Sequence, residues 1–423
     1  MSKLTVAWIC HFSNEEVRKR LPLVAKGKMI ADFAPWVTNL IQEFKQFDDI
    51  ELHVIAPHVG LKTFSCSFEM DGVQYHFFKA DIPFLNRYWP RFFRLDYYSG
   101  FARNRFLVSR FIQKIKPDII NLIGAENAYY SATVWGIRHL PVLITIQGIY
   151  SNEERFKVEK RDVVRCKVER RTHAENRYFA VNAAFMPDLI LRDASEPIFF
   201  WNRFPLKIVK LTDNQQAEKK YDFVFFSRMI ALKGTEDALE ALALVKQHRP
   251  DVTLRMMGYC DEAYVAELNE KAGKLGIADN VKISVGYALQ EDLLREAARA
   301  KYYLLPTKLD TIPGTILEAI HLGLPVVSYR TGDIPLLNKG DERVLLCERE
   351  DIAALADNML RLLNEPTLGA ELSRKAKAFV DRWFDNQSCA QNIVNQYKAV
   401  MAHYHNQEAI PAELLHENYL SSI

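Results

Sequence analysis

The chain has 423 residues, of which 49% are hydrophobic and 26% are charged, an ordinary mixture for a globular protein. At roughly 150 residues per domain, this length suggests two to three domains. The 55 basic and 53 acidic residues leave a formal charge of +2, which excludes an overall field that would attract nucleic acid.

The cysteines and the first residues of the chain indicate a cellular compartment. The six cysteines lie far apart and form no close pair, so we expect neither a zinc site nor a disulfide framework. Reduced thiols are typical of a cytosolic protein. The apolar run at residues 5–10 is short and lacks a cleavage motif, and no apolar stretch approaches the ~20 residues that cross a bilayer. We therefore expect a cytoplasmic protein, which leaves room for peripheral contact with the inner membrane surface.

Short apolar runs alternate with helix-length segments through the first half of the chain. A helix is expected at residues 30–47, where apolar residues recur at helical spacing. The expected strands are 6–10, 52–56, 73–78, 119–123 and 142–146. Continuous apolar strands that are separated by helices predict a parallel sheet with helices on both faces.

The same alternation restarts in the second half of the chain. A helix is expected at 235–247, and the expected strands are 222–226, 252–257, 281–284, 302–305 and 325–328. We therefore predict an α/β fold with Rossmann-like domains at 1–205 and 206–385, and a C-terminal helix and tail at 386–423 that packs back on the N-terminal domain. Ligands of such sheets bind at the carboxyl ends of the strands, so a cleft between the domains is the expected active site.

Two basic residues stand in the expected turn between the strand at 222–226 and the next helix. These are Arg228 and Lys233, and the helix begins at Thr235. A helix N-terminus carries partial positive charge and free N–H groups, so together with two cations it forms a site for a diphosphate. Viewed alone, the segment also fits two solvated basic residues in a loop.

Two carboxylates flank the start of a later helix. Asp310 lies in the loop before Pro313, which suits a first helical turn, and Glu318 lies inside the helix. A buried carboxylate can accept two hydrogen bonds from a vicinal diol such as a ribose. The N–H groups of Gly314 and Thr315 could meet a phosphate. Viewed alone, this segment also fits a capping acid and a surface glutamate.

Together and in this order, the two segments resemble the retaining glycosyltransferases of family 4. Arg228 and Lys233 match the Arg and Lys that this family places five residues apart, and Glu318 matches the second acid of its Glu-x7-Glu element. The resemblance covers residues 220–365 closely and the N-terminal half only in pattern. It implies the GT-B fold, in which two doubly wound Rossmann-like domains face a cleft.

The resemblance implies transfer of a sugar from a nucleotide-diphosphate sugar to a glycan, lipid-linked or other acceptor, in surface polysaccharide or glycoconjugate biosynthesis. By this resemblance Arg228 and Lys233 would hold the diphosphate, Glu318 the ribose and Asp310 the transferred sugar. Further donor-site candidates are Tyr287, Ala288, Leu289, Pro313, Gly314 and Thr315. The resemblance also implies retention of configuration at the transferred sugar.

We expect no metal ion and no cofactor. Arg228, Lys233 and a helix start can stabilise the charge that develops on the leaving diphosphate, which is the task of magnesium in other transferases. The sequence has no Asp-x-Asp element in a convincing loop.

Three residues of the N-terminal half are candidates for the acceptor side. His11 follows the first strand and Glu126 follows the strand at 119–123, so either could take part in deprotonating the acceptor. Gln147 stands where many family members have His, and it can form hydrogen bonds without carrying charge. Asp310 departs from the family's usual Glu and has a shorter reach. A structural role remains open for His11 and for Glu126.

Two other functions remain open. A nucleotide-sugar 2-epimerase can have the same two-domain fold, and fold alone does not settle the reaction. A non-catalytic protein that binds a nucleotide-sugar with two α/β lobes is the second alternative. The sequence names neither the donor base and sugar nor the acceptor.

An aromatic and basic stretch lies at residues 84–94. Its members at helical spacing and the arginines beside them are Phe84, Leu85, Tyr88, Trp89, Phe92, Phe93, Arg87, Arg91 and Arg94. Such a surface could hold a lipid-linked acceptor or rest on an anionic membrane. The alternative is that the aromatic side chains complete the N-terminal core.

Overall fold

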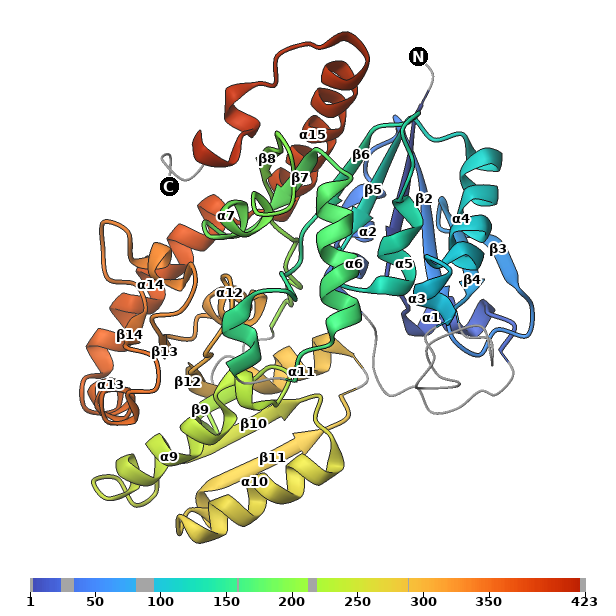
Figure 1. Ribbon diagram of the computed structural model, residues 1–423. Helices are drawn as coiled ribbons and strands as arrows, with labels where there is room; N and C mark the ends of the chain where they lie inside the picture. The colour runs from blue at the N-terminus through green and yellow to red at the C-terminus, as the bar shows by residue number, and fades with distance from the viewer. Residues whose placement is uncertain are drawn as a thin grey trace. The chain divides into compact units, whose positions relative to one another are not determined.

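The computed structural model describes residues 3–23, 34–80, 95–157, 160–211, 219–287 and 289–418. The chain divides into two compact units (Figure 1): unit 1 holds Met1–Pro205 and Asn386–Ser422, and unit 2 holds Leu206–Asp385. Both Ala288 and the aromatic stretch at 84–94 lie outside the described residues. None of the described helices is long and apolar enough to cross a membrane.

In the described part of unit 1, eight strands form one sheet in the order β3-β4-β2-β1-β5-β6-β7-β8. All neighbours are parallel except β3 and β4, which pair antiparallel. The strands are β1 Leu4–Cys10, β2 Ile50–His58, β3 Ser65–Met70, β4 Val73–Lys79, β5 Ile119–Ile123, β6 Val142–Thr145, β7 Tyr178–Val181 and β8 Ile198–Trp201. The helices are α1 Glu15–Arg20, α2 Pro35–Phe44, α3 Leu95–Tyr98, α4 Ala102–Ile115, α5 Ala128–Ser131, α6 Val163–Ala174, α7 Met186–Ile190 and α15 Asn386–Asn406, with 3-10 turns η1 Ala132–Val134, η2 Glu153–Lys157 and η6 Ala412–Leu414.

Alternate residues of β1 belong to two hydrophobic clusters, because successive side chains of a strand point to opposite faces of the sheet. Val6, Trp8 and Cys10 belong to a cluster that includes residues of α2 and α15. Ala7 and Ile9 belong to a cluster that includes residues of α4 and α7. Helices therefore cover both faces, as expected for a sheet of buried parallel strands.

The helix α15 joins the core of unit 1 through a buried hydroxyl group. The Tyr397 oxygen accepts hydrogen bonds from Nε1 of Trp8 at 2.9 Å and from Nδ2 of Asn121 at 2.7 Å. These partners precede Tyr397 by 389 and 276 residues. The helix near the C-terminus is thus fixed to the two central strands, β1 and β5.

In the described part of unit 2, six parallel strands form a sheet in the order β11-β10-β9-β12-β13-β14. The strands are β9 Tyr221–Phe226, β10 Leu254–Gly258, β11 Val281–Val285, β12 Ala300–Leu305, β13 Val326–Tyr329 and β14 Leu345–Cys347. The helices are α9 Thr235–Lys246, α10 Glu262–Lys274, α11 Gln290–Ala297, α12 Gly314–His321, α13 Ile352–Asn364 and α14 Pro366–Trp383, with 3-10 turns η3 Ala231–Lys233, η4 Ala278–Asn280 and η5 Ile334–Asn338. Two sheets, one parallel and one parallel except for the edge strand β3, together with their helices confirm the predicted α/β fold.

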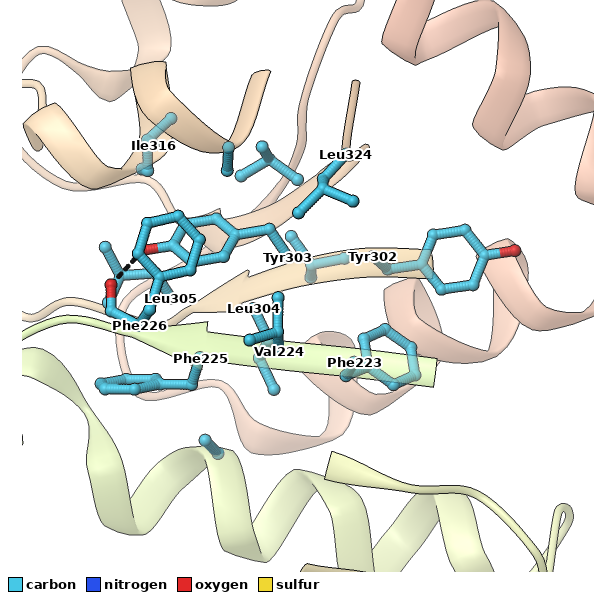
Figure 2. Close-up of a cluster of buried hydrophobic side chains, with 14 of the residues drawn as sticks. Phe223, Val224, Phe225, Phe226, Tyr302, Tyr303, Leu304, Leu305, Ile316 and Leu324 are labelled. Carbon is cyan, nitrogen blue, oxygen red and sulfur yellow. Dashed lines mark hydrogen bonds between the residues drawn. The ribbon is translucent and has the colours of Figure 1, made fainter. Parts of the chain in front are cut away.

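The two central strands of unit 2 are fixed to each other close to their carboxyl ends. Figure 2 shows the buried side chains of β9 and β12 side by side, with Ile316 of α12 beside them. The hydroxyl group of Tyr303 donates a hydrogen bond to the carbonyl oxygen of Phe226 at 3.0 Å, and the two rings lie 4.5 Å apart. Phe226 ends β9, so this contact holds the starting points of the loops after β9 and β12.

Candidate active site

The order of the strands in unit 2 reverses between β9 and β12. From β9 the chain continues through β10 to β11 on one side, and it then returns through β12 to β13 and β14 on the other. Ligands of doubly wound sheets bind at such a switch point, outside the carboxyl ends of the strands. The two loops that leave the sheet at this point contain the predicted residues Lys233 and Asp310.

Lys233 and Asp310 form an ion pair between Nζ and Oδ2, and their side chains are 18% and 16% exposed. The same carboxylate accepts hydrogen bonds from Oγ1 of Thr307 and from the backbone N–H of Thr311, both at 3.2 Å. Arg228 lies in the loop after β9 and is exposed. The structure thus joins two of the predicted site residues directly and places the third in the same loop as Lys233.

Two glycines bring the neighbouring loops into backbone contact with the loop of Asp310. A Cβ atom on Gly234 would lie 1.9 Å from the carbonyl oxygen of Pro306, and one on Gly332 would lie 2.0 Å from that of Asp310. Both glycines also have positive φ, +71° and +54°. The position of Asp310 therefore depends on close backbone packing that residues with a side chain would prevent.

We expect Gly234→Ala to destabilise unit 2 far more than a matched change at Gly276. Gly276 has nearly the same φ, +69°, but a Cβ atom there would meet no atom within 4 Å. Both changes cost about 1 kcal/mol for the left-handed backbone. The contact with Pro306 should add at least about 2 kcal/mol at Gly234. Denaturant unfolding measures both values, and equal losses would show that the loops can separate without cost.

Glu318 is buried on α12, with 6% of its surface exposed. Its Oε1 accepts a hydrogen bond from Nε2 of Gln290 at 2.6 Å, and Gln290 is the first residue of α11. Burial raises the pKa of the Glu318 carboxyl to about 8, although a hydrogen bond from the backbone of Lys207 acts in the opposite direction. At neutral pH the Glu318 carboxyl is therefore protonated in most of the molecules. A ligand that donates hydrogen bonds to it would favour the ionised form.

Of the two helix starts predicted to meet a phosphate, that of α12 is the more open. Its N-cap is Pro313, its first residue is the exposed Gly314, and its first turn contains no acidic residue. The first turn of α9 already contains Glu236 and Asp237, which offset the partial positive charge of that helix. Thr315, the second residue of α12, is partly buried.

The loop after β11 contains two further candidates, Tyr287 and Leu289. The Tyr287 oxygen accepts a hydrogen bond from Nη2 of Arg255 and lies 3.0 Å from the sulfur of Met257, to which its hydroxyl group donates. This side chain is therefore held inside unit 2. Leu289 is the N-cap of α11 and is 46% exposed, next to Gln290.

The acceptor-side candidates lie at the equivalent edge of the unit 1 sheet. The strand order there reverses between β1 and β5. His11 directly follows β1, Glu126 follows β5 and Gln147 follows the next strand, β6. The ring of His11 lies 6.2 Å from that of Tyr129 in an edge-on arrangement. All three candidates are partly exposed at the carboxyl ends of neighbouring strands.

Glu126 has an unusual environment for a carboxylate. Its Oε1 accepts a hydrogen bond from Nδ2 of Asn127 at 3.3 Å, whereas its Oε2 is buried without a hydrogen-bond partner among the described residues. Burial raises the pKa of Glu126 to about 7, the nearby Glu169 adds to this rise, and Arg165 and Arg155 oppose it. Near neutral pH this carboxyl can therefore either hold or accept a proton.

The sequence did not single out Gln290 or the group formed by Tyr150, Arg155, Arg165 and Glu169. Gln290 could have been found from its position at a helix start after the strand at 281–285. The group around Tyr150 comes from a loop and a helix that lack a recognisable motif.

Among the described residues, no group of three or more His, Cys, Asp or Glu side chains could hold a metal ion.

Comparison with known protein families finds a match within the C-terminal half. Residues 210–379 match the family model of the glycosyl transferases group 1. Residues 210–379, hereafter the group 1 domain, are thus similar in sequence to these transferases. All the predicted donor residues lie inside this group 1 domain, and the domain lies entirely within unit 2.

Matches to curated relatives differ in how much of the chain they cover. The amylovoran biosynthesis glycosyltransferase AmsK of Erwinia amylovora is 32% identical over 142 residues, which are 32% of this chain and 34% of the relative. An uncharacterized glycosyltransferase of Haemophilus influenzae is matched over 46% of its length. The chain thus spans about a third to a half of these two relatives. The N-acetyl-alpha-D-glucosaminyl L-malate synthase of Bacillus anthracis is 21% identical over 78% of this chain and 89% of its own.

Solved structures extend the likeness beyond the group 1 domain to nearly the whole chain. The sucrose-phosphate synthase of Thermosynechococcus elongatus has a TM-score of 0.75 at 14% identity and covers 95% of this chain and 100% of its own. HepE of Anabaena, solved with UDP and glucose, has a TM-score of 0.64 at 16% identity and covers 93% of this chain and 99% of its own. The chain therefore has the predicted GT-B fold, in which the group 1 domain is the second of two Rossmann-like domains.

Proposed function

We propose that the chain transfers a sugar from a nucleotide-diphosphate sugar to a hydroxyl group of a glycan, lipid-linked or other acceptor, in polysaccharide or glycoconjugate biosynthesis. The observation that supports this best is the meeting of Lys233 and Asp310 at the switch point of the group 1 domain. A cation for the diphosphate and an acid for the sugar are thereby side by side at the edge where ligands of such sheets bind.

The ion pair suggests how donor binding would prepare the site. Lys233 would exchange its bond with Asp310 for one with the diphosphate, whose two phosphates carry more negative charge than one carboxylate. Asp310 would keep its bonds from Thr307 and Thr311 and could then accept a hydrogen bond from a sugar hydroxyl. Arg228 and the N–H groups at the start of α12 would complete the set of donors around the phosphates.

The ribose would bind at Glu318. Its buried carboxyl accepts a hydrogen bond from Gln290, and in the ionised form it can accept two more from the ribose diol. During transfer the bond between the sugar carbon and the diphosphate oxygen breaks, a bond to the acceptor oxygen forms, and the proton of the acceptor hydroxyl passes to the leaving diphosphate. Lys233 and Arg228 would stabilise the charge left on the diphosphate, with retention at the sugar.

Nucleotide-dependent thermal unfolding tests the donor site. The full chain is heated with UDP, GDP, ADP or CMP, and a nucleotide at 100 times its Kd should stabilise the fold by about 2.7 kcal/mol. Arg228→Ala should lose the shift of the best nucleotide. The matching nucleotide-sugars are then incubated with acceptors: transfer supports the proposal, change of the sugar without an acceptor indicates an isomerase, and binding without reaction indicates a non-catalytic protein. No shift with any nucleotide would contradict the proposal.

We expect turnover to continue in an excess of EDTA. The proposed site neutralises the diphosphate with Lys233, Arg228 and backbone N–H groups, so no step needs magnesium. Initial rates with and without EDTA, and with added magnesium, measure this. Loss of activity in EDTA and recovery with magnesium would show that the protein cations are insufficient.

A further inference from the structure

A guanidinium group at the acceptor-side edge of unit 1 is held in a fixed position. Arg165 lies in the first turn of α6, and its Nε donates a hydrogen bond to the carbonyl oxygen of Glu126 at 2.9 Å. Its guanidinium carbon lies 3.8 Å from the centre of the Tyr150 ring. A cation over an aromatic face is stabilised by the ring, and the hydrogen bond fixes the direction of the group.

The ring below Arg165 is itself firmly positioned. Tyr150 is 5% exposed, and its backbone N–H donates to Oε1 of Glu169 at 2.7 Å. The next backbone N–H, that of Ser151, donates to Oε2 of Glu169 at 2.6 Å, and Glu169 is fully buried. Both carboxylate oxygens of Glu169 therefore accept hydrogen bonds from the backbone of the loop after β6.

Arg165 lies near a second guanidinium group, and the carboxyl groups of Glu126 and Glu169 lie in the same region. The guanidinium carbon of Arg155 lies 4.6 Å from the centre of the same Tyr150 ring. Arg165 itself forms no ion pair with a carboxylate in the described part of the chain, although its side chain is partly buried. Its two terminal nitrogens remain for a forked contact, the geometry that suits a phosphate or a carboxylate.

We propose that Arg165 binds an anionic group of the acceptor, a phosphate or a carboxylate, and that Arg155, which contacts the same Tyr150 ring, adds positive charge. The inference rests on the proposed function, because it assigns the anion to the molecule that receives the sugar. The location supports this assignment. Arg165 is hydrogen-bonded to the backbone of Glu126, which follows β5 at the switch point of unit 1. Tyr150 follows the neighbouring strand, β6. If the anion of the acceptor binds Arg165, the rest of the acceptor lies close to the Glu126 carboxyl, whose Oε2 atom is buried.

The first experiment measures anion binding directly, with the nucleotide site already filled. The full chain is saturated with the nucleotide diphosphate that stabilises it best, and inorganic phosphate or acetate is titrated at constant ionic strength. Arg165→Gln should weaken the binding of the preferred anion at least tenfold. Arg165→Lys, which keeps the charge but not the fork, should fall between this variant and the wild type. Arg170→Gln, an exposed change on the same helix, is the matched control and should bind as the wild type does.

The second experiment tests whether the anion belongs to the acceptor. Transfer is measured to glycerol and glycerol 3-phosphate, to glucose and glucuronate, and to vesicles of phosphatidylcholine with or without phosphatidylglycerol. The wild type should prefer the anionic member of at least one pair at least tenfold in kcat/KM, and Arg165→Gln should lose that preference. The preferred pair shows whether the anion is a soluble phosphate, a carboxylate or a lipid headgroup.

The outcomes separate this inference from the proposed function. Suppose that nucleotide binds and sugar is transferred, while the wild type, Arg165→Gln and Arg170→Gln have the same anion affinity and the same acceptor preference. In that case the inference is wrong and the proposed function stands. If no nucleotide binds, the proposed function itself fails. Unchanged nucleotide affinity and unfolding temperature in Arg165→Gln show that a loss of anion binding does not result from misfolding.

Discussion

Sugar transfer should slow by about 10²–10³-fold when Lys233 or Arg228 is replaced with alanine, because each change removes one preorganised charge at the leaving diphosphate. Arg228 is exposed, so its replacement should leave the fold unchanged. Lys233 is paired with Asp310, so its loss also leaves a carboxylate without its cation, and some loss of stability is expected. Steady-state rates are therefore measured together with the unfolding temperature.

Lys274→Ala provides the matched control in the same unit. Lys274 is 73% exposed on α10 and pairs with Glu270 one turn earlier, so its removal takes away one cation far from the predicted loops in sequence. It should retain nearly full activity. If both Lys233→Ala and Arg228→Ala were as active as this control, the diphosphate would have to bind elsewhere.

Glu318→Gln should weaken binding of the nucleotide diphosphate by about 1.5–3 kcal/mol, because an amide replaces the charged acceptor of the ribose hydroxyls. The wild-type affinity should also depend on pH. Since the pKa of Glu318 is about 8 and the diol favours the ionised form, binding below this pH must release a proton. Affinity should therefore rise between pH 6.5 and 8, flatten above that range, and lose this dependence in Glu318→Gln.

The same carboxyl should affect stability in the opposite direction. Its pKa in the folded chain is raised above the ordinary value of 4.5, so the protonated form favours folding. Its stabilising contribution is present below pH 4.5 and is lost as the pH rises from there to about 8. Unfolding of the wild type and Glu318→Gln between pH 5 and 9 measures this, with the exposed Glu267→Gln as control. Parallel pH profiles in all three proteins would show that burial of Glu318 has no energetic consequence.

The strands that sequence predicts best are those buried on both faces. The runs at 119–123 and 222–226 are apolar except for Asn121 and Asp222, and the structure places β5 and β9 there. Four strands were missed, and three of them, β7, β8 and β14, are short runs of three or four residues. The fourth, β3, was missed because its residues alternate between exposed and half-buried at the edge of the sheet. The signal was present in the Asp71-Gly72 turn, where both residues have positive φ and join β3 to β4 as a hairpin.

The candidate site was predictable as a set of residue types but not as a set of contacts. Arg228, Lys233, Asp310 and Glu318 were found from their spacing and their place at strand ends, and their proposed roles stay predictions. The partners of these residues follow only from tertiary structure. The Gln290 amide reaches Glu318 from another helix, and the extent of burial that raises the pKa of Glu318 is not written in any local pattern.

The route of the chain has a consequence for synthesis on the ribosome. Unit 2 is continuous in sequence from Leu206 to Asp385, whereas the core of unit 1 needs α15, which is made after it. At 5–20 residues per second, the sheet of unit 1 must wait roughly 10–40 s for Tyr397 to reach Trp8 and Asn121. During that interval the apolar face that packs against α15 is uncovered, while unit 2 can already fold. If synthesis stopped before α15, chaperones and proteases could reach the uncovered apolar face of unit 1, although unit 1 is translated first.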